Sequence, residues 1–127
     1  MIDGSLSVQD SKFDNTAQGD GGSFYLKDTA LAFGNSTVDG NAYDGDGGGF
    51  LLDGDGTGVL PHGATVGFSM DFGTSIRACS ASRDGGAIAL LNGTLTMLAC
   101  KLTDTQLAGR NGGVISATGG TVTSAMF

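Results

Sequence analysis

The sequence predicts an all-β fold: a right-handed single-stranded parallel β-helix (solenoid) of about five coils, each with about 26 residues and three short strands. Three observations predict it. Glycine occurs 24 times against a single proline, which indicates repeated tight turns of the backbone. All 13 acidic residues are aspartate, a residue that suits turns, whereas glutamate would favour helices. Short motifs also recur along the chain at similar spacings, as stacked repeats require.

The clearest motif is a glycine pair that follows an acidic or amide residue and precedes apolar residues. Its four copies lie at Asp20–Phe24, Asp46–Phe50, Asp84–Ile88 and Asn111–Ile115, and their first glycines are 26, 38 and 27 residues apart. The long middle interval indicates one coil plus an irregular insertion at about residues 53–64. We expect each glycine pair to form a corner, because a positive φ or a close neighbouring coil excludes a Cβ atom there. The preceding Asp or Asn is expected to cap the turn.

A second motif places an aliphatic residue between two small ones. Alternate residues of a strand face the same side, so we expect these aliphatic residues to stack in one interior column. The first column is Leu6, Leu31, Val66, Leu95 and Val122, and a second column, two residues further on, is Val8, Phe33, Phe68 and Met97.

A third motif aligns residues 11–16 with residues 100–105, and three motifs in phase predict three strands per coil. Residues 1–127 are then a single solenoid segment, expected to be part of a longer repeat protein. The alternative architecture is an antiparallel sandwich or barrel. Short strands joined by Asp-Gly turns suit it, but it requires no constant repeat length.

Charge and hydropathy exclude several classes of partner. The net charge is −7 and the six Lys and Arg residues are dispersed, so no basic stripe is available for a nucleic acid. No apolar run is long enough to predict a transmembrane segment, and the segment begins without a signal peptide.

The glycine motifs resemble a known family. Gly85-Gly86-Ala87-Ile88 and Gly112-Gly113-Val114-Ile115 are similar to the Gly-Gly-Ala-Ile motif of the surface repeats of polymorphic outer membrane proteins. The Phe-x-x-Asn motif of those repeats has partial counterparts at residues 13–15, 38–41 and 76–79. The resemblance implies a pectate-lyase-like β-helix in an extracellular or cell-surface adhesin or scaffold.

Four aspartates crowded among glycines are the candidate metal ligands: Asp44, Asp46, Asp53 and Asp55. Residues 53–58 resemble the opening of a calcium loop, with oxygen donors at alternate positions. Ala64 stands where such a loop needs a bidentate glutamate, so an EF-hand is excluded. Calcium is therefore the one candidate cofactor. The alternative to a metal site is that these aspartates cap turns and keep their carboxylates in solvent.

No catalytic motif can be identified, and we expect no enzyme activity. His62, the single histidine, falls in the expected insertion, and Arg77, Arg83 and Arg110 are assigned to surface charge.

The cysteines and two asparagines give two further predictions. The repeat alignment offsets Cys79 from Cys100 along the coil, which predicts two free thiols. Asn35 and Asn92 begin Asn-x-Ser/Thr triplets and are candidate glycosylation sites.

The leading functional hypothesis is a non-catalytic structural or adhesive surface module. Its expected partners are neighbouring repeats or other protein subunits of a larger assembly, with glycans as a second class. The alternative is a carbohydrate- and calcium-binding β-helix of lyase or hydrolase type. A third hypothesis is ice binding, suggested by outward-facing Ser and Thr residues that flank the first interior column.

Overall fold

The computed structural model describes residues 2–42, 44–54, 67–71, 73–103, 109–110, 114–118 and 120–125. These residues form eleven strands and no helix, and every strand pair is parallel. The strands are β1 (Ile2–Gln9), β2 (Lys12–Ala17), β3 (Phe24–Gly34), β4 (Thr37–Ala42), β5 (Phe50–Asp53), β6 (Gly67–Met70), β7 (Ser75–Ala81), β8 (Ile88–Leu98), β9 (Lys101–Thr103), β10 (Ile115–Ala117) and β11 (Gly120–Ala125). The all-β prediction is confirmed for this part of the chain. Its described residues contain no helix that could cross a membrane.

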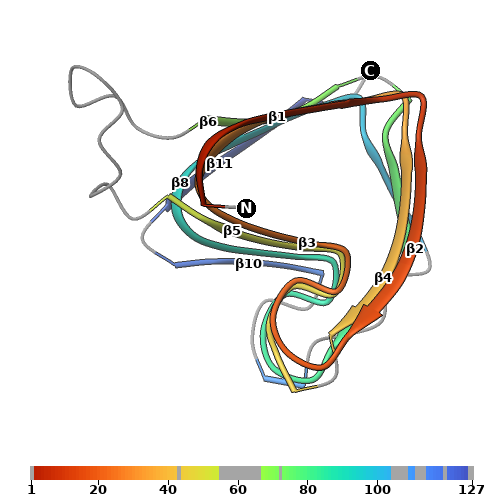
Figure 1. Cartoon of the computed structure of the whole chain (residues 1–127), viewed down its shortest axis with the longest axis vertical. Coiled ribbons are helices and arrows are strands. Elements are labelled where there is room, and N and C mark those ends of the chain that lie inside the picture. Colours follow the sequence, from red (N-terminus) through yellow and green to blue (C-terminus); the bar gives the residue numbers. More distant parts are fainter. Residues whose placement is uncertain are drawn as a thin grey trace.

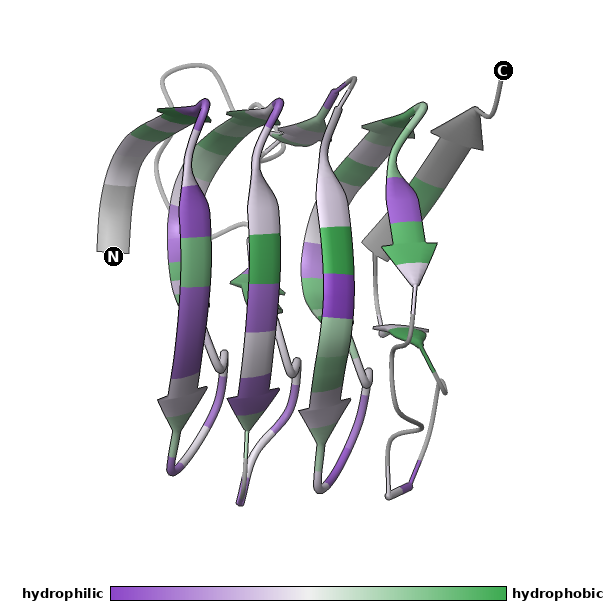
Figure 2. Cartoon of the chain, turned by 90° about the vertical axis from the view of Figure 1, so that its right-hand side faces the viewer, coloured by the Kyte–Doolittle hydropathy of each residue, from purple (hydrophilic) through white to green (hydrophobic). Residues whose placement is uncertain are grey.

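The strands form two sheets (Figure 1). Sheet A has seven strands, with β1, β3, β5, β8 and β10 in one path and β6 and β11 paired beside it. Sheet B has four strands in the order β2-β4-β7-β9. Strands of successive repeats overlie one another in Figure 1 and stand side by side in Figure 2.

The strand register follows the spacing of the glycine motifs. Phe50 pairs with Phe24 and with Ile88, and Ile88 pairs with Ile115. These offsets are 26, 38 and 27 residues, equal to the intervals between successive glycine pairs. The motif alignment therefore correctly identified which strands are neighbours.

The predicted three short strands per repeat are wrong in one respect. β3 and β8, each of 11 residues, bend and continue where two separate strands were expected. The first part of β3 pairs with β5 and its second part with β6, and the bend lies at Asp28, whose φ is 47°. One residue with a positive φ turns the chain without ending the hydrogen-bonded ladder.

The interior columns are confirmed at most positions and need one correction. Leu6 pairs with Leu31, and Leu95 pairs with Val122, as expected. Between them, however, Phe68 pairs with both Leu31 and Leu95, in the place predicted for Val66. Met70 accordingly takes the place predicted for Phe68, between Phe33 and Met97.

This shift by two residues has a simple cause. The insertion adds chain of arbitrary length, and a shift by two keeps the same residues facing inward, so the alternation of apolar and polar residues cannot distinguish the two registers. Asp53 ends β5, whereas Val66, His62 and the remainder of the expected insertion from residue 55 lie outside the described residues.

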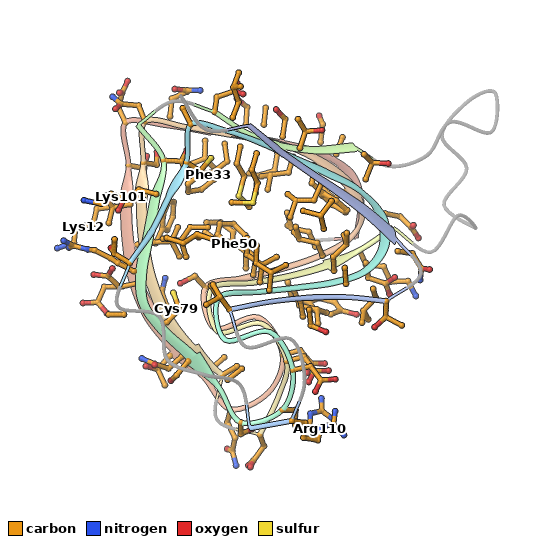
Figure 3. All side chains as sticks on the ribbon, turned by 180° about the vertical axis from the view of Figure 1, so that it is seen from behind. Lys12, Phe33, Phe50, Cys79, Lys101 and Arg110 are labelled. Carbon is orange, nitrogen blue, oxygen red and sulfur yellow. The ribbon has the colours of Figure 1, made fainter. Side chains whose placement is uncertain are left out.

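Aromatic rings fill the core between the sheets. Phe24 and Phe50 stack with ring centroids 4.9 Å apart, and Phe33 packs edge-on against Phe50 at 5.4 Å (Figure 3). Phe33 and Phe50 are almost completely buried. Burial of each such side chain stabilises the fold by about 1.5–3 kcal/mol.

Three of the four glycine pairs form corners, as predicted, whereas Gly112 and Gly113 lie outside the described residues. The first glycines Gly21, Gly47 and Gly85 have φ values of 66°, 67° and 63°. The second glycines allow neighbouring repeats to approach, because a Cβ atom on Gly48 would overlap the backbone of Gly86 and Ser80. The Gly48 N–H donates to the Gly85 carbonyl at 3.2 Å, so the corners are themselves hydrogen-bonded to one another.

A second series of corners connects sheet A to sheet B and was not predicted. Its residues have φ values of 51°, 42°, 77° and 54°, at Asp10, Asn35, Gly73 and Ala99. They share one register position, two residues before Lys12, Thr37, Ser75 and Lys101. Only one of the four is glycine, so no repeated letter marks this corner in the sequence.

Candidate functional site

A ladder of aspartates runs along the glycine corners. The Oδ1 atom of Asp20 accepts the backbone N–H of Asp46 at 2.9 Å, and the Oδ1 atom of Asp46 accepts that of Asp84 at 2.9 Å. Each carboxylate therefore caps the backbone of the next repeat rather than its own turn. The Asp before each glycine pair was expected to cap its own corner, but its hydrogen bond to the next repeat was not predicted.

Two arginines neutralise this ladder. Arg83 contacts Asp20 at 2.7 Å and Asp46 at 3.3 Å, and Arg110 contacts Asp84 at 3.3 Å and Asp46 at 3.8 Å. Each arginine thus reaches back along the two preceding repeats. The hydrogen bond that Arg83 donates to Asp20 and the negative charge of Asp46 raise the pKa of the Arg83 guanidinium further above its usual value. Both arginines were expected to supply only surface charge, although each directly precedes the Asp or Asn of a corner motif.

The candidate metal ligands occupy different places. Asp44 is exposed near the corner, and Asp46 belongs to the ladder with its carboxylate engaged by Arg83 and Arg110. Asp53 lies at the far end of β5, with its Oδ1 atom 3.5 Å from Nδ2 of Asn92. No group of three metal-ligating side chains occurs within the ranges that the structure describes. Asp55 lies outside those ranges, so calcium binding stays a prediction.

The outer face of sheet B carries paired polar side chains. Asp39 accepts two hydrogen bonds from the Arg77 guanidinium, at 3.0 and 3.3 Å, across the β4–β7 pair. The Ser80 hydroxyl donates to Oδ1 of Asn41 at 2.6 Å. Charged and apolar residues alternate along these strands in Figure 2, which separates a polar outer face from the apolar interior.

The outer face of sheet A carries small residues. Ser7 pairs with Ala32, Ala32 with Ser69, and Ser69 with Thr96. Gly67 follows Val66 and was therefore expected in this outward-facing column, but the corrected register places Ser69 there. The side chains of Thr121 and Thr123 lie outside the described residues. Ice binding by this face stays a prediction.

The two cysteines are free, as the offset alignment predicted. Cys79 is completely buried, and burial raises the pKa of its thiol to about 11. It follows Ala78, an additional residue that bulges β7 relative to β4, with φ of 50°. Cys100 is half-buried, and burial also raises the pKa of its thiol.

One candidate glycosylation site lies at a corner and the other within a strand. Asn35 is exposed at the sheet A to sheet B corner, and its Nδ2 donates to Asp10 at 2.5 Å. Asn92 is half-buried on β8 beside Asp53. Glycan attachment at either residue stays a prediction.

Comparison of the chain with protein-family models, curated proteins and solved structures gives no match.

Proposed function

We propose that this chain is a non-catalytic structural or adhesive surface module of a larger extracellular β-solenoid protein. In this proposal sheets A and B are walls of one right-handed single-stranded parallel β-helix of about five coils. Pairing between equivalent residues of successive repeats supports the helical path. Right-handedness is supported by the general rule that connections between parallel strands of one sheet are right-handed.

The observation that carries the proposal is the regular register along the outer face of sheet A, where β1, β3, β6 and β8 pair without a shift. A column such as Ser7, Ala32, Ser69 and Thr96 crosses four strands at a spacing of about 4.8 Å. Rigid, evenly spaced side chains suit contact with another extended surface, because few of them lose conformational freedom when they bind. Neighbouring repeats, other protein subunits and glycans are the proposed partners.

The end repeats provide a second support. Apolar side chains in the middle of the stack are buried, whereas their equivalents in the end strands are half-buried, with Val8 as an exception. The latter are Leu6, Phe13 and Phe24 at one end and Leu102, Val114, Ile115 and Val122 at the other. Half-buried apolar ends suit a module that packs against further repeats.

The proposal is tested by adhesion of protein-coated beads. Beads carrying the chain are expected to be retained on epithelial cell layers or on immobilised polygalacturonate more strongly than albumin-coated beads. A Thr96→Arg variant alters only the sheet A face, and an Arg77→Glu variant alters only the sheet B face. Each variant is the control for the other, so loss with one alone identifies the binding face. Retention no greater than that of albumin on every surface would refute an adhesive function.

A further inference from the structure

Many of the aspartates directly precede a glycine, which makes them chemically reactive toward their own main chain. Glycine has no side chain to hinder the attack of its backbone nitrogen on the carboxyl carbon of the aspartate before it. These aspartates are Asp3, Asp20, Asp39, Asp44, Asp46, Asp53, Asp55 and Asp84. The structure describes the side chains of all of them except Asp3 and Asp55. By sequence alone these dipeptides are equivalent, so any difference between them comes from the fold.

Two features of a fold slow this attack. The glycine nitrogen must give up its proton, so a hydrogen bond that holds the N–H group opposes the reaction. The carboxyl carbon must turn back onto its own main chain, so contacts that hold the carboxylate elsewhere oppose it as well.

The aspartates of the corner ladder are held in both ways. The Oδ1 atoms of Asp20 and Asp46 each accept a backbone N–H of the next repeat at 2.9 Å, and each carboxylate also contacts a guanidinium. The N–H groups of Gly21 and Gly47, which would have to attack, donate to backbone carbonyls of the next repeat at 2.8 Å. Both dipeptides are therefore protected by contacts between repeats.

Three other aspartates are held at one of the two groups. The carboxylates of Asp39 and Asp84 each contact an arginine, at 3.0 and 3.3 Å. Asp53 is followed by Gly54, whose N–H donates to the carbonyl of Asn92 at 2.9 Å.

Asp44 is held at neither group. It is exposed in the bend between β4 and β5 (Figure 1), and no hydrogen bond or ion pair joins its carboxylate to another described residue. Among the described residues, none accepts the N–H of Gly45. Gly45 is buried, as Gly21 and Gly47 are, so burial of the glycine does not distinguish the dipeptides.

We infer that Asp44 is a modification site, at which the folded chain isomerises to isoaspartate through a cyclic imide. The nitrogen of Gly45 forms a bond to Cγ of Asp44, and one carboxyl oxygen leaves as water with the proton of that nitrogen and a proton from solvent. Water then opens the ring at the main-chain carbonyl, so the side-chain carboxyl carbon becomes part of the main chain. This inference is independent of the adhesive function.

Isomerisation at Asp44 lengthens the main chain at the corner by one carbon–carbon bond, about 1.5 Å. Gly45 has no room for this change, because a Cβ atom there would already overlap the backbone of Gly19. The Gly45 carbonyl also accepts the N–H of Arg83 at 3.1 Å, and the Arg83 side chain joins Asp20 to Asp46. A modified Asp44 therefore displaces the ladder that protects its neighbours.

The test is to age the folded chain in water that carries heavy oxygen, because each opening of the imide leaves one heavy oxygen in the residue. Mass spectrometry of peptic peptides with electron-transfer fragmentation locates the label and identifies isoaspartate. Asp44 should be labelled about tenfold faster than Asp20 or Asp46, because the breaking of one hydrogen bond slows a reaction by about that factor. In concentrated urea, which removes the contacts between repeats, the three residues should be labelled at similar rates.

Two variants complete the test. Asp44→Glu keeps the charge but requires a larger and less favourable ring, so it should remove the label at this position, and the exposure of Asp44 predicts that the variant folds. Arg83→Gln removes one guanidinium contact from each of Asp20 and Asp46, so it should raise the labelling of both and leave that of Asp44 unchanged. Aged wild type should unfold at a lower urea concentration than fresh protein, whereas aged Asp44→Glu should keep its midpoint.

Several outcomes overturn the inference. They are labelling of Asp44 no faster than that of Asp20 and Asp46 in the folded chain, a difference of the same size in urea, or label at Asp44 without isoaspartate. Unchanged labelling of Asp20 and Asp46 in folded Arg83→Gln would refute protection by the ladder. Equal loss of stability in aged wild type and aged Asp44→Glu would refute the effect of Asp44 on the corner.

Discussion

Replacement of Gly48 by alanine should destabilise the fold strongly, although its φ is outside the left-handed region. A Cβ atom there would lie 2.6 Å from the backbone nitrogen of Ser80 and closer still to the Gly86 carbonyl oxygen. Both obstacles are backbone, so they cannot rotate away as a side chain would. Gly48→Ala must therefore separate two repeats at their corner.

The magnitude follows from three contributions to the free energy of unfolding. Overpacking costs about 1–3 kcal/mol. Strain on the 3.2 Å bond from Gly48 to Gly85 costs about 1 kcal/mol more. The reduced entropy of the unfolded chain offsets about 0.4–1 kcal/mol. The net loss is about 2–3 kcal/mol, a large part of the stability of about 5–15 kcal/mol that is usual for a domain.

Urea unfolding followed by circular dichroism measures this loss. A decrease of about 1 M in the unfolding midpoint is expected for Gly48→Ala, given usual m-values of about 1–3 kcal/mol per molar urea. The control is Gly67→Ala, because a Cβ atom on Gly67 has no neighbour within 4 Å and the residue is exposed. Gly67→Ala should leave the midpoint unchanged or raise it slightly. Equal midpoints for the two variants would refute the close approach of the corners.

Four further predictions concern charge, a buried thiol, calcium and ice. Arg83→Gln should lower the thermal midpoint of unfolding at low salt, because it removes the contacts with two carboxylates. The difference in midpoint from wild type should shrink in 1 M salt, where the Debye length is about 3 Å. A difference that does not depend on salt would contradict this explanation. The raised pKa of Cys79 means that the folded state keeps its proton when the unfolded thiol ionises, so stability present below pH 9.0 should be lost as the pH rises to about 11. A Cys79→Ala variant with the same pH dependence as wild type would show that another group is responsible. If the loop binds calcium, calorimetric titration should give heat with the wild-type chain that a double Asp53→Asn and Asp55→Asn variant lacks. Absence of heat with the wild-type chain would refute the calcium site. Thermal hysteresis that Thr96→Tyr abolishes would establish ice binding, whereas a wild-type value equal to that of buffer would leave the small residues with a role in the sheet alone.

Local conformational preference identified one series of corners and missed the other. Gly21, Gly47 and Gly85 were identified because a positive φ repeatedly demands glycine at one position. The corners at Asp10, Asn35 and Ala99 were missed, because these non-glycine residues adopt the same conformation under tertiary constraint. The Asp20–Arg83 contact was likewise unpredictable, since it joins residues 63 positions apart and depends on a side chain that spans two repeats.

The sequence by itself determined the parallel pairing of repeats, the inward-facing columns and the glycine corners, because each depends on a period or a conformational demand that the residues themselves carry. Only the tertiary structure decided the register of Phe68 after the insertion, the bend that joins two strands within β3, and the contacts of Asp46 with Arg83 and Arg110. A slip of two residues preserves every inward-facing position, so it is resolved by how side chains of different size fill the interior. Contacts between repeats similarly depend on the distance between neighbouring chains, which no local pattern encodes.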